Sequence, residues 1–433
     1  MNFAQALQYL EDLNAFGSQL GLARIQQITE LLGNPQARYR TIHVTGTNGK
    51  GSVTAMLAGI LTQSGIRTGM YVSPHLVSYT ERMQIDGQTI SEQDFADSMT
   101  VVRAAAEKMV AACSEQPTQF EILTAAAFWY FHQKNVEYAV IEVGLGGLLD
   151  STNVIIPEVS VITNVTMEHA DRCGGTLEGI ARHKAGIIKA GVPVVTAAVG
   201  EPLKKILQAA AAEKNTDIFI AGQDFSSSFV HFDGKVQQLE FSSGLLGAVK
   251  EPYDLQMLGT HQIENSALAV MTARLLHNTD ARITPGSIAL ALAITSWPGR
   301  FERMDRGDQH ILIDGAHNPA GMEVLRQSLD LYYPVEERVI LLGILKDKDI
   351  HTMLATLLRP NDTVVVTAPN SARASDPEAV ARQIHTQHVE VQPDPVEALA
   401  RSLELANSQR LLCVAGSLYL IGGIRQALLN KKE

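Results

Sequence analysis

The run from Thr45 to Ser52 reads TGTNGKGS and brings together three glycines, three hydroxyl side chains and one lysine. The apolar residues Ile42 to Val44 flank it on one side, and Val53 to Leu61 follows with apolar residues at helical spacing. Glycine lets backbone amides turn toward an anion, and the N-terminus of the following helix presents more of them. Lys50 adds a positive charge for β- and γ-phosphates, and a nearby hydroxyl can ligate Mg²⁺. The run therefore predicts a nucleoside triphosphate site.

This run differs from the common P-loop at two positions. The common pattern has a glycine five residues before the Gly-Lys pair, where this chain has Val44, and a Ser or Thr after the lysine, where it has Gly51. A generic glycine-rich turn is therefore the alternative interpretation. The order of strand, loop, lysine and helix favours nucleotide binding.

Three more polar side chains follow expected strands. Ser73 comes after a strand ending at Tyr71-Val72, Glu142 closes one, and His169 lies just past another. Ligands bind open α/β sheets at the carboxyl ends of the strands. A hydroxyl, a carboxylate and an imidazole could share a divalent cation, although only the oxygen ligands suit Mg²⁺ well. Each residue alone is better explained by a structural role, and their shared position favours the joint interpretation.

Other candidates have equally plain alternatives. Lys184 falls on an otherwise apolar helix face, where a lysine can also extend its head into water. Asp314 ends a strand, and Asn318 with Pro319 also forms an ordinary helix cap. Arg300 is either a surface charge of a linker or a phosphate ligand.

Strands and helices alternate along most of the chain. Strands are predicted at 40–45, 68–72, 138–142, 159–163, 192–196 and 217–220, and helices at 51–64, 92–112, 120–133, 177–189 and 201–213. Further strands are predicted near 309–313, 338–342, 362–366 and 410–414. Such alternation is typical of a mainly parallel sheet covered on both faces. We expect an α/β fold: an N-terminal P-loop-type domain with a mainly parallel sheet, then a smaller C-terminal α/β domain.

Three local signals refine this organisation. Residues 1–38 read as largely helical, with an apolar stripe of Tyr9, Leu10, Leu13, Phe16 and Leu20. The pair Asp233-Gly234 between two strand-like runs predicts a β-hairpin inserted at the edge of the first domain. Pro298 and Gly299 break the chain as an interdomain linker should. The expected domains are therefore 1–296 and 297–433.

Composition narrows the class of protein. The 433 residues are 45% hydrophobic and carry a net charge of −11, so a large core is available and no basic stripe supports nucleic-acid binding. The three cysteines are far apart, which indicates neither a disulfide framework nor a zinc site. No apolar run reaches the ~18 residues needed to span a bilayer, and the first 23 residues lack the basic residues of a signal peptide. We expect a protein of the reducing cytoplasm with no membrane partner.

Together these segments resemble the folylpolyglutamate synthase/dihydrofolate synthase family within the Mur ligases, over nearly the whole chain. The matching motifs are Val44–Val53 (VTGTNGKGSV), Ser73–Leu76, Glu81-Arg82, Thr118–Glu121, Glu142–Gly147 (EVGLGG), Asp150 with Thr152-Asn153, Lys184–Ile187, His261-Gln262 with Asn265, Pro298–Arg300, Asp314–Pro319 (DGAHNP) and Gly416–Tyr419. The loop that departs from the common P-loop is this family's own form.

The resemblance implies an ATP-dependent, ADP-forming ligase of folate biosynthesis and one-carbon metabolism. ATP would convert a carboxylate of folate or dihydropteroate into an acyl phosphate, which the amino group of L-glutamate attacks. ATP would bind between the domains through Gly46, Thr47, Asn48, Gly49, Lys50, Gly51, Ser52, Asn265, Arg300 and Asp314. Mg²⁺ would be held by Ser73, Glu142 and His169, with Lys184 carbamylated to carry a second ion. Thr118 and Phe120 would face the pterin, and His317 and Ser417 the glutamate; Lys50, Lys184 and His317 form the implied catalytic set. The family suggests a monomer.

The chain departs from the family pattern at four places. Leu148 replaces an arginine, His183 replaces a glutamate, Glu168 stands for aspartate and Ala372 for proline. Leu148 and His183 either replace an ion pair without effect or mark altered substrate choice or reduced activity. Two other functions therefore stay open: a Mur-type ligase with a different carboxylate acceptor, and a degenerate nucleotide- or pterin-binding homologue. The preferred pterin and the number of glutamates added are left open as well.

Overall fold

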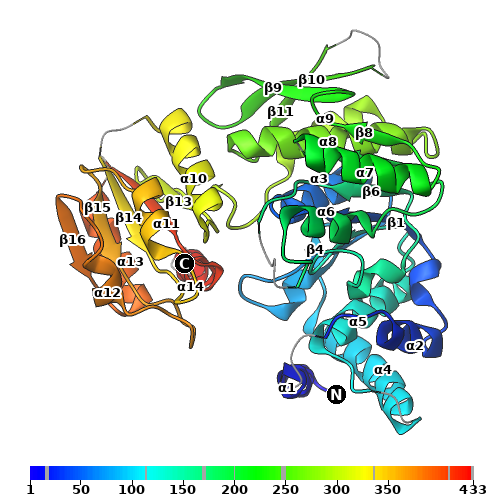
Figure 1. Cartoon of the computed structure of the whole chain (residues 1–433). Coiled ribbons are helices and arrows are strands. Elements are labelled where there is room, and N and C mark those ends of the chain that lie inside the picture. Colours follow the sequence, from blue (N-terminus) through cyan, green and yellow to red (C-terminus); the bar gives the residue numbers. More distant parts are fainter. Residues whose placement is uncertain are drawn as a thin grey trace. The chain divides into compact units, whose positions relative to one another are not determined.

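The computed structural model describes residues 1–14, 19–112, 115–167, 172–198, 200–244, 250–334, 337–407 and 410–430. The chain divides into two compact units (Figure 1). Unit 1 comprises Met1–Ser228, Leu239–Asp254 and Glu264–Thr295, and unit 2 comprises Phe229–Gln238, Leu255–Ile263 and Ser296–Glu433. Two inner segments, 229–238 and 255–263, therefore group with the C-terminal part of the chain.

Unit 1 is built on an eight-stranded sheet with the order β4-β3-β2-β5-β1-β6-β7-β8. Its strands are β1 (Arg40–Thr45), β2 (Thr68–Tyr71), β3 (Met83–Ile85), β4 (Gln88–Thr89), β5 (Tyr138–Glu142), β6 (Val159–Ile162), β7 (Val194–Thr196) and β8 (Ile218–Ile220). Six neighbouring strands, in the order β2-β5-β1-β6-β7-β8, run parallel, and β3 and β4 join antiparallel at one edge. Residues of β1 and β5 are almost all buried, as expected for the centre of a covered parallel sheet.

Helices pack against this sheet and against one another. They are α1 (Phe3–Asn14), α2 (Ala23–Leu31), α3 (Lys50–Gln63), α4 (Glu92–Ala111), α5 (Gln119–Gln133), α6 (Leu177–Ala185), α7 (Glu201–Glu213), α8 (Thr260–His277) and α9 (Pro285–Ile294), with short 3₁₀ turns at Pro35–Ala37, Tyr79–Arg82 and Ser151–Val154. Helix α3 contacts β1, β2 and β5 and is covered by α9. A hydrophobic core joins α1, α2, α4 and α5 to Tyr71, Ala139 and Ile141 of the sheet.

Unit 2 contains a six-stranded sheet with the order β12-β13-β17-β14-β15-β16, drawn in yellow to red in Figure 1. Its elements are β12 (Glu302–Arg303), β13 (Ile311–Ile313), α10 (Pro319–Tyr332), β14 (Arg338–Leu342), α11 (Ile350–Leu357), β15 (Thr363–Val366), α12 (Pro377–Ala381), β16 (His388–Val391), α13 (Pro395–Ala406), β17 (Leu411–Ala415) and α14 (Leu418–Asn430). All neighbours are parallel except β12 and β13.

The expected hairpin is part of a third, three-stranded sheet with the order β11-β10-β9, formed by β9 (Phe225–Phe232), β10 (Gln237–Ser243) and β11 (Lys250–Leu255). Its tip, 229–238, belongs to unit 2, although the sequence suggested an insertion at the edge of the first domain. Aromatic packing explains this grouping, because Phe229 and Phe232 both lie edge-on to Tyr332 of α10. The α/β fold class and the mainly parallel sheet are confirmed.

The described part of residues 1–38 is largely helical, as predicted, with α1, α2 and the turn at Pro35–Ala37. Leu10 and Leu13 are buried as expected, but Leu20 lies outside these helices and is 37% exposed. Phe16 lies outside the described residues. The helix predicted at 177–189 ends at Ala185, because the amides of Gly186, Ile187 and Ile188 bond to the carbonyl three residues before each of them, as in a tight turn. Among the described residues, no helix is long and apolar enough to cross a membrane.

Candidate active site

Two glycines of the loop between β1 and α3 sit where no side chain fits. Gly46 has a φ of 152°, and a Cβ there would lie 1.7 Å from Oγ1 of Thr163. Gly49 has a φ of 83°, and a Cβ there would lie 2.4 Å from Oδ1 of Asn265. The backbone is therefore held against its neighbours in a conformation that L-residues rarely adopt.

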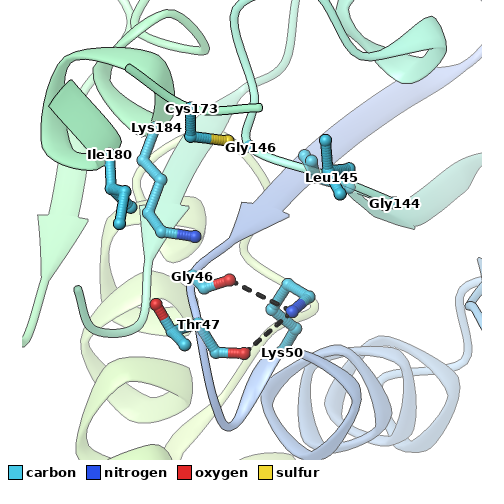
Figure 2. A pocket seen from close by; sticks show the side chains of 10 residues that line it. Gly46, Thr47, Lys50, Gly144, Leu145, Gly146, Cys173, Ile180 and Lys184 are labelled. Carbon is cyan, nitrogen blue, oxygen red and sulfur yellow. Dashed lines mark hydrogen bonds between the residues drawn. The ribbon is translucent and has the colours of Figure 1, made fainter. Parts of the chain in front are cut away.

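The N-terminus of α3 opens directly onto this loop. Gly49 precedes the helix, and in the described part of the chain no side chain caps it. The first-turn amides of an α-helix have no intrahelical acceptor, and the N-terminus of a helix therefore favours an anion. Nζ of Lys50 donates to the carbonyl oxygens of Gly46 (3.1 Å) and Thr47 (3.0 Å), which folds the lysine over the loop. Figure 2 shows this arrangement.

The segment after β6 holds the loop from one side. The amides of Thr47 and Asn48 donate to the backbone and side-chain oxygens of Asn164 (3.0 and 2.9 Å). Oγ1 of Thr163 donates to the Asn48 carbonyl at 2.6 Å, and the amide of Thr166 donates to Oγ1 of Thr47 at 3.0 Å. We did not predict these residues from the sequence, although four consecutive residues after an apolar strand include three polar ones. Asn164 therefore engages the amides of both Thr47 and Asn48.

A pocket within unit 1 joins this loop to α6 and to the turn after β5. Its lining comprises Gly46, Thr47, Lys50, Val143, Gly144, Leu145, Gly146, Cys173, Ile180 and Lys184. Lys184 is only 4% exposed, and Figure 2 shows its side chain reaching from α6 toward Gly46 and Thr47. The pocket is thus lined by two lysines, which is an arrangement suited to a polyanion such as a triphosphate.

Of the expected metal ligands, Ser73 and Glu142 lie together. Ser73 follows β2 and Glu142 is the last residue of the neighbouring parallel strand β5, and the amide of Ser73 donates to Oε2 of Glu142 at 3.1 Å. Glu142 is 4% exposed. His169 lies outside the described residues, and the described ranges hold no group of three or more His, Cys, Asp or Glu side chains placed for a metal ion. A buried carboxylate beside a serine suits a hard cation.

The two residues expected to face the pterin differ in their surroundings. Thr118 is buried and caps α5: its Oγ1 accepts from the amide of Glu121 at 3.2 Å, and Glu121 returns a contact to the Thr118 amide at 2.7 Å. This capping box accounts for the threonine hydroxyl. Phe120 packs over Gly144 of the pocket, because a Cβ on that glycine would lie 2.4 Å from Cζ of the ring.

In unit 2, Asp314, His317 and Ser417 follow two adjacent parallel strands, β13 and β17, whereas Arg300 precedes β12. The buried carboxylate of Asp314 accepts from the amides of Phe301 and Ala316, both at 2.8 Å. Burial raises the pKa of Asp314, and nearby Arg300 opposes this rise.

The residues expected on the glutamate side lie on the segments that follow those strands. Nδ1 of His317 lies 2.7 Å from the Gly315 carbonyl. Oγ of Ser417 accepts from the amides of Tyr419 (3.1 Å) and Leu420 (3.4 Å), at the start of α14. Asn265, by contrast, belongs to unit 1 and packs on Gly49.

Comparison with known proteins accounts for this combination. The Mur ligase middle domain family matches residues 44–273, and the Mur ligase glutamate ligase domain family matches residues 299–418. A folylpolyglutamate synthase of Lacticaseibacillus casei is 37% identical over 438 residues, which is 100% of both chains. The chain therefore belongs to the folylpolyglutamate synthase family of Mur ligases.

Solved structures agree with this assignment. Mycobacterium tuberculosis folylpolyglutamate synthase complexed with ADP and AMPPCP has a TM-score of 0.88 at 31% identity, covering 99% of each chain. Escherichia coli FolC in complex with DHPP and ADP has a TM-score of 0.88 at 27% identity, covering 100% of this chain and 99% of that one. Like other members of the folylpolyglutamate synthase family, the chain is an ATP-dependent, ADP-forming amide ligase and binds a nucleotide.

Two departures from the family pattern are adjacent in the structure. Leu148 follows the EVGLGG turn, and its amide donates to the carbonyl oxygen of His183 on α6. Leu148 is 44% exposed, and His183 is half-buried. His183 precedes Lys184 of the pocket, so the altered pair lies at the margin of the site.

Proposed function

We propose that unit 1 (within residues 1–296) activates a folate carboxylate with ATP and that unit 2 (mainly 297–433) supplies the contacts to L-glutamate. The chain joins L-glutamate to a folate in an ATP-dependent reaction. In the proposed order, the γ-phosphoryl group moves to the carboxylate, and the glutamate amine displaces phosphate from the acyl phosphate. The observation that most directly supports this proposal is the pocket that Lys50 and Lys184 line beside the uncapped start of α3.

The chemistry of phosphoryl transfer explains why this pocket is suitable. Negative charge concentrates on the transferred group, and catalysis depends on positioning and on compensating charge. We assign the phosphates to Gly46 through Ser52, with Lys50 as the mobile cation. Asn265, which packs on Gly49, and Arg300 and Asp314 of unit 2 are the proposed remaining nucleotide contacts.

The residues present fit a magnesium ion. Ser73, Glu142 and His169 would hold Mg²⁺, which would supply positive charge to the phosphates. A carbamate on Lys184 would replace a buried cation by oxygen atoms suited to a second ion. Lys184 is 4% exposed and lines the pocket, so a carbamate on it would lie at the pocket wall. This assignment remains a proposal.

The acceptor and the amine are assigned by chemistry and by relatives. We place the pterin near Phe120, which packs over the pocket residue Gly144 and can stack on an aromatic ring. We place Thr118 near it as the cap that orients α5. His317 and Ser417, after β13 and β17, would position L-glutamate. Acceptance of dihydropteroate as well as reduced folate, a monomeric state and a cytoplasmic location remain proposals.

The test is ADP release by the purified chain with Mg-ATP and L-glutamate, adding tetrahydrofolate or dihydropteroate separately. We expect release only when glutamate and a pterin are both present. Lys50→Met should lower the rate by at least about 100-fold, a loss of the size found when one charge-stabilising group is removed from a transition state. Lys205→Met, on the exposed side of α7, is the matched control and should retain activity. ADP release without any pterin, or tight AMPPCP binding with no release, would contradict the folate assignment.

A further inference from the structure

One face of β1 is tied to the turn that follows β5. Thr41, His43 and Thr45 alternate along β1 and therefore point to the same side of the strand. Oγ1 of Thr45 donates to the Gly146 carbonyl at 2.7 Å. Thr45 is 0% exposed, and Gly146 is buried as well. Since Gly146 lines the pocket and β1 leads into the loop of Lys50, this bond connects the two walls of the site directly.

His43 reaches the same turn through two further side chains. Its Nε2 lies 2.8 Å from Oγ1 of Thr152, and that hydroxyl donates to Oδ1 of Asp150 at 2.5 Å. The other carboxylate oxygen of Asp150 accepts from the amide of Leu145 at 2.8 Å. His43, Thr152 and Asp150 are each at most 3% exposed.

The direction of these bonds fixes the protonation of His43. When Asp150 is ionised, the Thr152 hydroxyl gives its only hydrogen to Asp150 and accepts from His43, which then carries its proton on Nε2. Nδ1 then has a lone pair, and it has no hydrogen-bond partner among the described residues. Burial, with a smaller effect of Lys189, lowers the pKa of His43 to about 3, which keeps the imidazole neutral. With His43 neutral and donating from Nε2, the hydrogen bonds run in one direction, from His43 through Thr152 to Asp150.

The turn after β5 also packs on Lys184, the second lysine of the pocket. A Cβ on Gly147 would lie 2.8 Å from the His183 carbonyl oxygen and 3.2 Å from Cα of Lys184. Displacement of the turn would therefore move the backbone of α6 at Lys184. The contacts of Thr45 and His43 therefore set two distances: from the loop of Lys50 to the turn after β5, and from that loop to α6.

We infer that His43 and Thr45 are positioning residues for phosphoryl transfer, acting through Gly146 and through Thr152 and Asp150 on the turn that faces Lys50. The inference rests on the proposed function of this pocket. It predicts that loosening the turn lowers kcat more than it lowers nucleotide affinity, because the nucleotide is held by Gly46 through Ser52 on the other wall. A shift of about 1 Å can cost on the order of 100-fold in rate.

The test compares identical substitutions along one strand face. Thr45→Val and Thr152→Val should each lower kcat by about 10- to 100-fold with AMPPCP affinity within about threefold of the unchanged chain. Thr45→Ser and Thr152→Ser keep the hydroxyl and should restore kcat to within about threefold. Thr41→Val is the matched control, because Oγ1 of Thr41 contacts the Ile156 carbonyl, away from the turn. It should keep kcat within about twofold. His43→Leu should resemble Thr152→Val, and the pair should be non-additive because both act on one chain of bonds.

A second measurement does not depend on turnover. Amide hydrogen exchange of the peptide spanning 143–148 should accelerate in Thr45→Val and Thr152→Val and stay unchanged in Thr41→Val. Equal kinetic losses in Thr41→Val and Thr45→Val, equal losses of AMPPCP affinity and kcat, or unchanged exchange would overturn the inference. If the proposed function were wrong, the chain without any substitution would itself show no pterin-dependent ADP release.

Discussion

The amide of Leu148 donates to the carbonyl oxygen of His183 at 2.8 Å. The contact is close on the helix side too, because a Cβ on Gly186 would lie 2.4 Å from Cα of Leu148. The two positions at which the chain departs most from its family are therefore neighbours through their backbones. Their side chains can change together while the backbone contact, which fixes the turn on α6, stays the same.

We predict that Leu148→Arg combined with His183→Glu restores an ion pair without altering the reaction. Leu148 is 44% exposed, so the coupling energy should be modest, about 0.5–1 kcal/mol. A double-mutant cycle by urea denaturation measures this coupling. Kinetics of the double variant should stay within about threefold of the original chain. A change above about tenfold in kcat/KM for either pterin would show that the pair sets substrate choice.

Replacement of Gly49 by alanine should weaken nucleotide binding. Gly49 and Gly65 flank the two ends of α3 with φ values of 83° and 73°, and only Gly49 has a neighbour, Oδ1 of Asn265, within contact range of a new Cβ. Both substitutions place an L-residue in the left-handed region, which costs roughly 1–2 kcal/mol. Gly49→Ala should also lower AMPPCP affinity by more than about tenfold, whereas Gly65→Ala should leave it unchanged. Calorimetric titration with AMPPCP separates the two, and equal affinities would contradict the steric argument.

Carbamylation of Lys184 predicts a carbon signal that depends on this residue alone. In ¹³C-bicarbonate, ¹³C NMR of the purified chain should show one protein-bound carbamate resonance, which Lys184→Gln removes. The same variant should lose pterin-dependent ADP release, because the oxygen ligands for a second ion are lost. Lys189→Gln is a useful control on the segment after α6, since Nζ of Lys189 donates to the Asn153 carbonyl outside the pocket. A resonance that persists in Lys184→Gln would place the modification elsewhere.

His43 should make the stability of unit 1 depend on pH in mildly acidic solution. Burial lowers the pKa of His43 to about 3 from an ordinary value near 6.5 in the unfolded chain. Between these values the unfolded chain binds more protons, so the stability that neutral His43 supports is complete above about pH 7 and falls as the pH drops. At pH 5 the loss should be about 2 kcal/mol. Urea denaturation at pH 7.5 and 5.0 measures it, and His43→Gln should flatten the slope by up to one proton. An unchanged slope would contradict the neutral buried state.

Two neighbouring tyrosines should respond in opposite ways to loss of their hydroxyls. The Tyr332 hydroxyl donates at 2.6 Å to the fully buried Gln237, whose amide nitrogen donates to the Met257 carbonyl. Tyr332→Phe leaves a buried acceptor unpaired and should cost about 1–3 kcal/mol. The buried Tyr333 hydroxyl has no hydrogen-bond partner in the described ranges, so Tyr333→Phe should be neutral or slightly stabilising. Thermal unfolding of both variants tests this, and equal losses would contradict the role of Gln237.

The sequence predicted those parts of the structure that depend on local patterns. The apolar runs of β1 and β5 identified central strands, and the glycines and Lys50 identified the nucleotide loop, because both patterns act over a few residues. The strands β3, β12 and β16 were missed because they are only 3, 2 and 4 residues long, too short to show an alternation of their own. At the site, the Asn164 anchor and the bond of Thr45 to Gly146 were missed because each joins residues more than 100 positions apart.

Unit 2 is built from three separate stretches of the chain, so it cannot be exchanged between relatives as one continuous segment. The segment from Ser296 onward does not contain Gln237, the partner of Tyr332, nor Leu258, which belongs to the same core as Phe301 and Leu329. A fragment beginning at the linker would expose that core and leave a buried tyrosine unpaired. Gene recombination that exchanges unit 2 between relatives, in the laboratory or in evolution, must therefore exchange 229–238 and 255–263 together with the segment from Ser296 onward. A single crossover at Pro298 would produce a chimera whose two halves do not match.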